Sequence, residues 1–133
     1  MIFGIGIDTI EVGRIANSIA TYGDQFVRRI FSEEETRYCA PRPHAAEHFA
    51  ARFAAKEAFA KALGTGVRRG FIWKEVSVRK MFTGQPFIQL GETMRSRATG
   101  IIGANFRIKV SITHTKELAE AIVLIELDES QVQ

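Results

Sequence analysis

Two carboxylates that lie far apart in the sequence have the chemistry of a metal site. Asp8 ends an apolar stretch over residues 3–8, whose alternation with a period of two predicts a strand. Glu57 shares one side of a predicted helix with Phe53 and Ala60, because successive residues turn about 100° around a helix axis. Carboxylate oxygens are the ligands that Mg²⁺ prefers. Asp8 and Glu57 could therefore hold Mg²⁺ together if the fold brings them to one place.

Each carboxylate also has an ordinary structural interpretation. Asp8 could cap the N-terminus of a helix that starts near Ile10. Glu57 could pair with Lys61, which lies one turn later on the same helix. That pairing accounts for Lys61, but it does not account for a glutamate on the same side of the helix as Phe53. A metal ion shared with Asp8 accounts for both.

Three cations, Arg52, Lys56 and Lys61, lie on the same predicted helix. They could form a solvated face, or they could bind phosphate groups. Lys61 is also close in sequence to Arg68 and Arg69, which follow in a loop punctuated by glycines. Cations at that place complement the dipole of the helix, and a phosphate cradle is the alternative.

Two further residues, His114 and Cys39, have side chains of the kinds that bind ligands or metals. His114 ends a predicted strand, in which it shares one face with Val110 and Ile112. Such a histidine is typical of a core or of a sheet edge, but its place next to Thr115 also suits contact with a ligand. Cys39 has no cysteine or histidine at the spacing of a zinc site, and we expect it to be inert.

The elements that must position these residues have recognisable boundaries. Ser32 and Glu35 form the pattern of a capping box, which starts a helix at Glu33. Gly64 is suited to end the long alanine-rich helix. The predicted order is a strand at residues 3–8, helices at 10–22, 24–30, from 33 to the prolines at 41 and 43, and at 44–63, strands at 73–82 and 87–90, a helix at 92–99, and a hairpin of strands at 106–114 and 118–127. Runs of one element type predict an α+β fold, with a mainly antiparallel sheet packed against a long central helix and shorter helices.

Composition limits the class of protein. The length of 133 residues predicts a single domain over residues 1–133. A composition of 46% hydrophobic and 25% charged residues excludes a disordered chain. Residues 1–109 carry 17 basic and 10 acidic side chains, an excess that should attract a phosphorylated ligand, an acidic protein or a nucleic acid. Three features predict a cytoplasmic protein without a membrane partner. The chain has one cysteine, no apolar run near the roughly 18 residues of a membrane span, and no basic segment before its first apolar run.

Two sequence blocks resemble the holo-acyl-carrier-protein synthase family, the small trimeric type of 4′-phosphopantetheinyl transferase. The first is Gly-Ile-Gly-Ile-Asp-Thr-Ile-Glu at residues 4–11, followed by Arg14 and Ile15. The second and more specific block is Phe-Ala-Ala-Arg-Phe-Ala-Ala-Lys-Glu-Ala at residues 49–58, continued at residues 61–66. Weaker likenesses at residues 31–35, 84–86 and 111–115 extend the match over nearly the whole chain. Gln85 departs from the family, in which many members have a basic residue there.

The resemblance implies a transfer reaction. The phosphopantetheine arm of coenzyme A would move to a serine of apo-acyl carrier protein, and adenosine 3′,5′-bisphosphate would leave. Asp8 and Glu57 would hold Mg²⁺ and, with Lys61 on the pyrophosphate, would be the catalytic residues. The coenzyme-binding residues implied by the match are Arg52, Lys56, Lys61, Gly64, His114 and Thr115. The group that takes the serine proton stays open between a water molecule at the metal and a carboxylate such as Glu57.

The resemblance also implies two protein partners. One is the acidic acyl carrier protein, for which Arg14, Arg28 and Arg29 are the expected contacts. Surface charges of this kind mainly steer the encounter and lose effect as salt rises. The other partner is the chain itself, since the family's homotrimer places each site between neighbouring subunits.

Two alternatives belong to other classes. A Mg²⁺-dependent nucleotide pyrophosphate hydrolase would keep Asp8 and Glu57 but use water as the acceptor. A small basic nucleic-acid-binding protein would interleave aromatic and basic residues on one sheet face. Here Phe3, Phe87 and Phe106 belong to strongly apolar predicted strands, so we expect no nucleic-acid partner.

Overall fold

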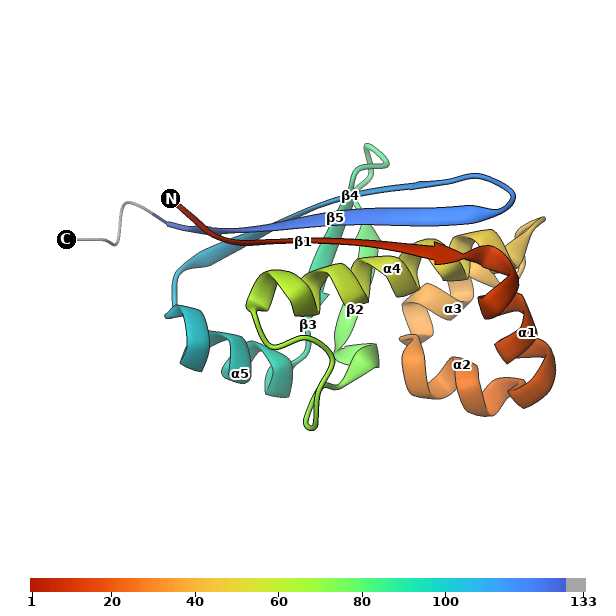
Figure 1. Ribbon diagram of the computed structural model, residues 1–133, viewed down its shortest axis with the longest axis horizontal. Helices are drawn as coiled ribbons and strands as arrows, with labels where there is room; N and C mark the ends of the chain where they lie inside the picture. The colour runs from red at the N-terminus through yellow and green to blue at the C-terminus, as the bar shows by residue number, and fades with distance from the viewer. Residues whose placement is uncertain (129–133) are drawn as a thin grey trace.

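A computed structural model describes residues 1–128 (Figure 1). Its elements are β1 (Ile2–Glu11), α1 (Val12–Tyr22), α2 (Asp24–Ile30), α3 (Glu33–Cys39), α4 (Ala45–Leu63), the 3₁₀ turn η1 (Trp73–Glu75), β2 (Val76–Lys80), β3 (Pro86–Leu90), α5 (Glu92–Ile102), β4 (Phe106–His114) and β5 (Leu118–Leu127). Figure 1 shows α4 along one face of the long sheet, with α1, α2 and α3 near one end and α5 near the other. This arrangement confirms the predicted α+β fold.

The sheet packed on α4 is antiparallel throughout. Its strand order is β1-β5-β4, while β2 and β3 form a separate antiparallel hairpin. Ala119, Ala121 and Val123 of β5 are buried on the inner face of the sheet. Asp8 of β1 is paired with Ala121, and paired residues of antiparallel strands point to the same side. The register therefore aims Asp8 towards the central helix.

Glycines let β1 lie directly on the backbone of α4. A Cβ atom on Gly4 would lie 1.9 Å from the carbonyl oxygen of Ala62, and one on Gly6 would lie 1.9 Å from that of Ala58. The helix residues that face these glycines, Ala58 and Ala62, are small and buried. Neither layer has a side chain that would hold the other at the usual distance. This close approach sets how near the end of β1 comes to the middle of α4.

The outer face of the same sheet exposes an apolar patch where β1 meets β5. Ile5 and Ile7 of β1 are 60% and 54% exposed, and Ile122 of β5, which pairs with Ile7, is 36% exposed. Figure 1 shows the helices on the opposite side of the sheet. Apolar surface gathered in this way is typical of a face that meets another protein.

Several element boundaries differ from the sequence prediction, and α1 begins at Val12 instead of residue 10. The first strand continues to Glu11 because β5 keeps pairing with it as far as Leu118, so Asp8 lies inside the strand. The strand expected from Trp73 begins at Val76, because η1 intervenes. The helix α5 continues to residue 102, since Met94 and Ala98 bury one side of it. Helix α2 has the predicted bounds, and α4 begins one residue later than predicted.

The predicted capping box is present at the start of α3. The Glu35 amide donates to Ser32 Oγ at 3.2 Å, and the Ser32 amide donates to Glu35 Oε1 at 2.9 Å. Across residues 1–128, none of the helices is both long enough and apolar enough to cross a bilayer.

Candidate active site

Asp8 and Glu57 line one cavity, of about 310 Å³, between β1, α1, α2 and α4. Lys61 lies at its rim, where its Nζ donates to Asp8 Oδ1 at 3.1 Å and to the carbonyl oxygen of Ile7 at 2.9 Å. Asp8 is thus no helix cap. The residue that caps α1 is Glu11, and it makes no side-chain capping bond. The structure therefore brings together the three residues that the sequence analysis expects to be catalytic.

The carboxylates of Asp8 and Glu57 in this cavity could hold a cation between them. The pKa of Glu57 is raised, first by burial and then by the negative charge of nearby Asp8, with Lys61 acting in the opposite direction. A glutamate whose ionisation is disfavoured by a neighbouring carboxylate gains from a positive ion between the two groups. Within residues 1–128, no group of three or more His, Cys, Asp or Glu side chains could hold a metal. Two carboxylates nevertheless fit Mg²⁺, which completes its six positions with water and substrate phosphates.

The three arginines expected to contact a carrier protein do not line one cavity. Arg14 lines the cavity of Asp8 and Glu57. Arg28 lines a cavity of about 870 Å³ between α2 and α3, and Arg29 lies beside the loop that follows α4. All three are exposed, so they remain available to a partner.

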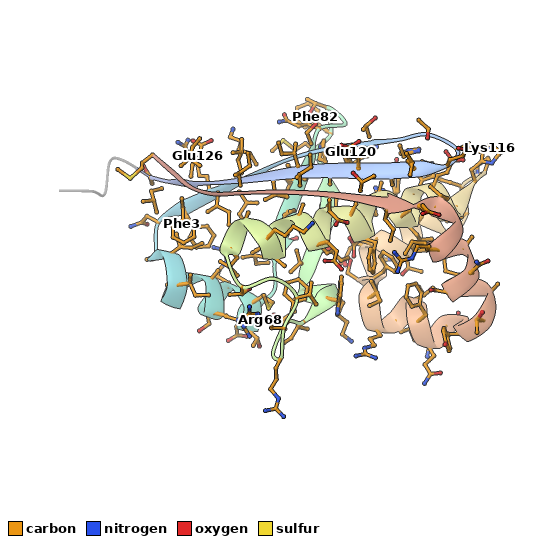
Figure 2. All side chains as sticks on the ribbon, viewed as in Figure 1. Phe3, Arg68, Phe82, Lys116, Glu120 and Glu126 are labelled. Carbon is orange, nitrogen blue, oxygen red and sulfur yellow. The ribbon has the colours of Figure 1, made fainter. Side chains whose placement is uncertain are left out.

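The basic loop after α4 is separate from Lys61. Arg68 and Arg69 line a cavity of about 500 Å³ with Arg29 and Lys74, and Lys61 is not among its lining residues. Figure 2 shows Arg68 extended away from the body of the molecule. The structure thus gives no support to a single phosphate cradle made of Lys61 and this loop.

The expectation that Lys56 orients phosphates is corrected by the structure. Its ammonium group is fully buried and donates to Glu35 Oε1 at 2.7 Å, to the Val76 carbonyl at 2.6 Å and to the Trp73 carbonyl at 3.1 Å. Glu35 Oε2 accepts from the Val78 amide at 2.9 Å. Burial lowers the pKa of Lys56, and Glu35 opposes that shift. Lys56 therefore joins α3, α4 and β2 instead of facing a ligand.

Arg52 and His114 meet in a second cavity, of about 440 Å³, which also contains His48 and Lys80. Arg52 is only 2% exposed, and its Nη1 donates to the His48 carbonyl at 3.2 Å. The buried Nε of Arg52 has no hydrogen-bond partner in the described part of the chain. His114 Nδ1 lies 3.2 Å from Glu47 Oε1. The cavity is lined by Arg52, Lys80, His48 and His114, so its cationic lining suits an anion.

The two cavities face different directions within one chain. Arg52 and Glu57 are five positions apart on α4, which turns them about 140° from each other around the helix axis. The other two expected ligand contacts, Gly64 and Thr115, line neither cavity. Gly64 ends α4 in the left-handed conformation, and Thr115 Oγ1 accepts from the Leu118 amide at 3.1 Å in the β4–β5 turn.

Sequence reasoning did not identify His48 or Lys80, which line the second cavity. His48 lies one helical turn before Arg52, a spacing that could have indicated it. The pKa of His48 is lowered by burial and by the positive charges of His114 and Arg52. Burial raises the pKa of Cys39 to about 11, so this thiol stays protonated at neutral pH, in keeping with the inert role expected for it.

Comparison with known proteins adds independent observations. The family model of the 4′-phosphopantetheinyl transferase superfamily matches residues 4–119. A holo-[acyl-carrier-protein] synthase of Koribacter versatilis is 44% identical over 126 residues, which cover 95% of this chain and 99% of that protein. A holo-[acyl-carrier-protein] synthase of Chlamydia trachomatis is 42% identical over 124 residues, which cover 93% and 99%.

Solved structures show the same fold. The holo-[acyl-carrier-protein] synthase of Neisseria meningitidis superposes with a TM-score of 0.84 at 32% identity, covering 95% of this chain and 99% of that one. The Bacillus anthracis holo-(acyl-carrier-protein) synthase, solved in complex with CoA (3′,5′-ADP), gives a TM-score of 0.78 at 34% identity, with 96% and 99% covered.

Proposed function

The chain belongs to the 4′-phosphopantetheinyl transferase superfamily and is an enzyme of its holo-[acyl-carrier-protein] synthase family; from this premise we propose the reaction that it catalyses. It transfers the 4′-phosphopantetheine group of coenzyme A to a serine of apo-acyl carrier protein, with Mg²⁺, and releases adenosine 3′,5′-bisphosphate. The observation that supports this most strongly is the convergence of Asp8, Glu57 and Lys61 on one cavity.

The bonds that change define what the site must do. The serine Oγ forms a bond to the phosphorus that carries pantetheine, and the bond from that phosphorus to the bridging oxygen breaks. The leaving group is the 5′-phosphate of adenosine 3′,5′-bisphosphate, and the serine proton goes to a base. Such a transfer depends on positioning and on neutralising negative charge. Mg²⁺ held by Asp8 and Glu57 would supply that neutralisation on the diphosphate.

Lys61 would add a second positive charge. Its ammonium group is held 3.1 Å from Asp8 Oδ1, and its side chain is half exposed. An ammonium fixed by a carboxylate and a backbone carbonyl is already oriented before the substrate arrives. It can donate its remaining hydrogen to an oxygen of the diphosphate, where charge grows as the bond breaks.

The second cavity would bind the other phosphate of coenzyme A. The coenzyme carries a diphosphate and a phosphomonoester, and the guanidinium-bearing Arg52 lines this cavity with His114 and Lys80. A guanidinium is suited to phosphate because its planar donors match two oxygens. Since the two cavities face apart around α4, the diphosphate and the phosphomonoester of one coenzyme would be held by residues of two neighbouring chains.

This sharing requires an assembly, and we infer a homotrimer. The exposed apolar patch formed by Ile5, Ile7 and Ile122 is the surface available for it. Closed symmetric assemblies bury such faces in identical interfaces. The acyl carrier protein would then approach over Arg14, with Arg28 and Arg29 of α2 nearby on the exposed surface.

Mass spectrometry of an apo carrier protein tests this function. The carrier is incubated with the chain, coenzyme A and Mg²⁺, and the small products are separated by chromatography. We expect the carrier to gain one phosphopantetheine group while adenosine 3′,5′-bisphosphate appears in equal amount. Free phosphopantetheine with an unmodified carrier would instead establish hydrolysis. An unmodified carrier with intact coenzyme A would contradict both reactions.

A further inference from the structure

Tyr38 of α3 lies among three cations that come from three different parts of the chain. The guanidinium carbon of Arg42 is 3.7 Å from the centre of the Tyr38 ring, and that of Arg52 is 4.3 Å from it. Lys80 Nζ is 4.9 Å from the same centre and donates to the Tyr38 hydroxyl at 2.8 Å. The bond from Lys80 lowers the pKa of Tyr38, and the nearby Arg42 and Arg52 add to this effect.

Two of these cations, Arg52 and Lys80, line the cavity that contains His114. Arg52 is the buried guanidinium whose Nε lacks a partner. His48 also faces this cavity, and its ring meets the edge of Tyr38 with 5.9 Å between the ring centres. Glu47, bonded to His114, is the acidic side chain beside the cluster. The aromatic ring thus backs the wall of a cavity that suits an anion.

Cations gathered so closely repel one another when no anion is bound. The face of an aromatic ring attracts each of them through its quadrupole, and the phenol oxygen accepts a hydrogen bond from the ammonium. A tyrosine ring also fixes their directions, because it has only two side-chain torsions. An aliphatic residue of similar size would fill the space but would attract none of the three.

From these contacts we infer that Tyr38 is a positioning residue, which holds Arg52 and Lys80 in the arrangement that receives the phosphomonoester of coenzyme A. The inference rests on the proposed function for the choice of coenzyme. Tyr38 itself touches no reacting atom. Its effect should therefore be confined to binding of the 3′-phosphate and should leave the chemical step unchanged.

The variants Tyr38→Leu and Tyr38→Phe test this role. Both are assayed with coenzyme A and with 3′-dephospho-coenzyme A, which lacks only the phosphomonoester. For Tyr38→Leu we expect KM for coenzyme A to rise about tenfold, with kcat and KM for the dephospho form within about twofold of wild type. Tyr38→Phe keeps the ring and loses one hydrogen bond, so its KM for coenzyme A should rise about threefold.

A binding measurement reads the same effect without any transfer. Titration calorimetry with adenosine 3′,5′-bisphosphate should show about tenfold weaker binding to Tyr38→Leu, while binding of adenosine 5′-monophosphate stays unchanged. Tyr22→Leu, at the exposed end of α1, is the matched control and should behave as wild type in every assay. Thermal unfolding shows whether each variant is folded. If Tyr38→Leu is unfolded, the results for Tyr38→Phe decide whether Tyr38 has the positioning role.

The outcomes separate this inference from the proposed function. An active wild type whose Tyr38 variants keep the same preference for coenzyme A over the dephospho form would overturn the inference alone. Equal losses with both coenzymes, or a fall in kcat, would also overturn it, because they would indicate general damage to the fold. A wild type that never modifies a carrier would contradict the proposed function, while the calorimetric comparison would still decide the role of Tyr38.

Discussion

Replacing Gly6 with alanine should separate the two carboxylates without touching either of them. The new Cβ atom would lie 1.9 Å from the carbonyl oxygen of Ala58 and 2.8 Å from the amide nitrogen of Ala62, both on the backbone of α4. Ordinary contact begins at 3.4 Å, so β1 must move away from α4 by about 1.5 Å at this point. Asp8, two residues further along β1, would move with the strand.

The shift has two measurable consequences. Misplacement of a catalytic group by about 1 Å can cost about a hundredfold in rate, and we expect kcat for carrier modification to fall by about that factor. Overpacking of this kind destabilises by about 1–3 kcal/mol, which corresponds to a melting temperature lower by about 4–12 °C. Carrier modification is followed by mass spectrometry well below the melting temperature, and unfolding is followed by circular dichroism.

Gly100→Ala is the matched control. Gly100 lies in α5 with no other atom within 4 Å of the added Cβ, so alanine should keep full activity and raise stability by about 0.5–1 kcal/mol. If Gly6→Ala kept both the wild-type rate and the wild-type melting temperature, the contact between β1 and α4 would not set the geometry of the site.

Three other perturbations follow from the same contacts. Lys56→Met should lower the free energy of unfolding in urea by about 3–5 kcal/mol, because it leaves Glu35 buried without its cation. Lys109→Met, at an exposed position, is the control, and equal effects of the two substitutions would count against this explanation. Arg14→Glu should raise KM for the carrier about tenfold in low salt and spare KM for coenzyme A, and the reverse pattern would be incompatible with a carrier contact. The pKa of His48 is lower in the folded chain than in the unfolded chain, where it is near 6.5, so stability should fall as pH drops through about 6.5. The urea midpoint of His48→Gln should therefore depend less on pH between 7.5 and 5.5 than that of the wild type, and an unchanged dependence would refute this.

Local signals predicted the elements well. The capping box at Ser32 and the glycine after Leu63 act through neighbours a few residues away, so the sequence alone reveals them. The convergence of Asp8 and Glu57 was also expected, from their residue types and from a family resemblance that the comparisons confirm. The C-terminal end of β1 at Glu11 was not predicted, because it depends on pairing with β5, which is distant in sequence.

Long-range contacts account for the residues that were misassigned or missed. Glu35 was interpreted only as a capping residue, yet its carboxylate also receives Lys56 from α4, and nothing in the local sequence of either residue shows this pairing. The cluster around Tyr38 is built from α3, α4 and the β2–β3 hairpin, so it exists only after tertiary packing. Burial likewise separates Lys56 from its exposed helix neighbour Lys61, although both are lysines of one helix.

Binding of Mn²⁺ as a substitute for Mg²⁺, followed by electron paramagnetic resonance, tests most directly whether Asp8 and Glu57 hold one divalent ion. The wild-type chain with adenosine 3′,5′-bisphosphate should bind one Mn²⁺ per chain, and Asp8→Asn and Glu57→Gln should each lose that binding while remaining folded. Asp24→Asn, which alters an exposed carboxylate of α2, should bind as wild type. Unchanged Mn²⁺ binding in both Asp8→Asn and Glu57→Gln would contradict the account.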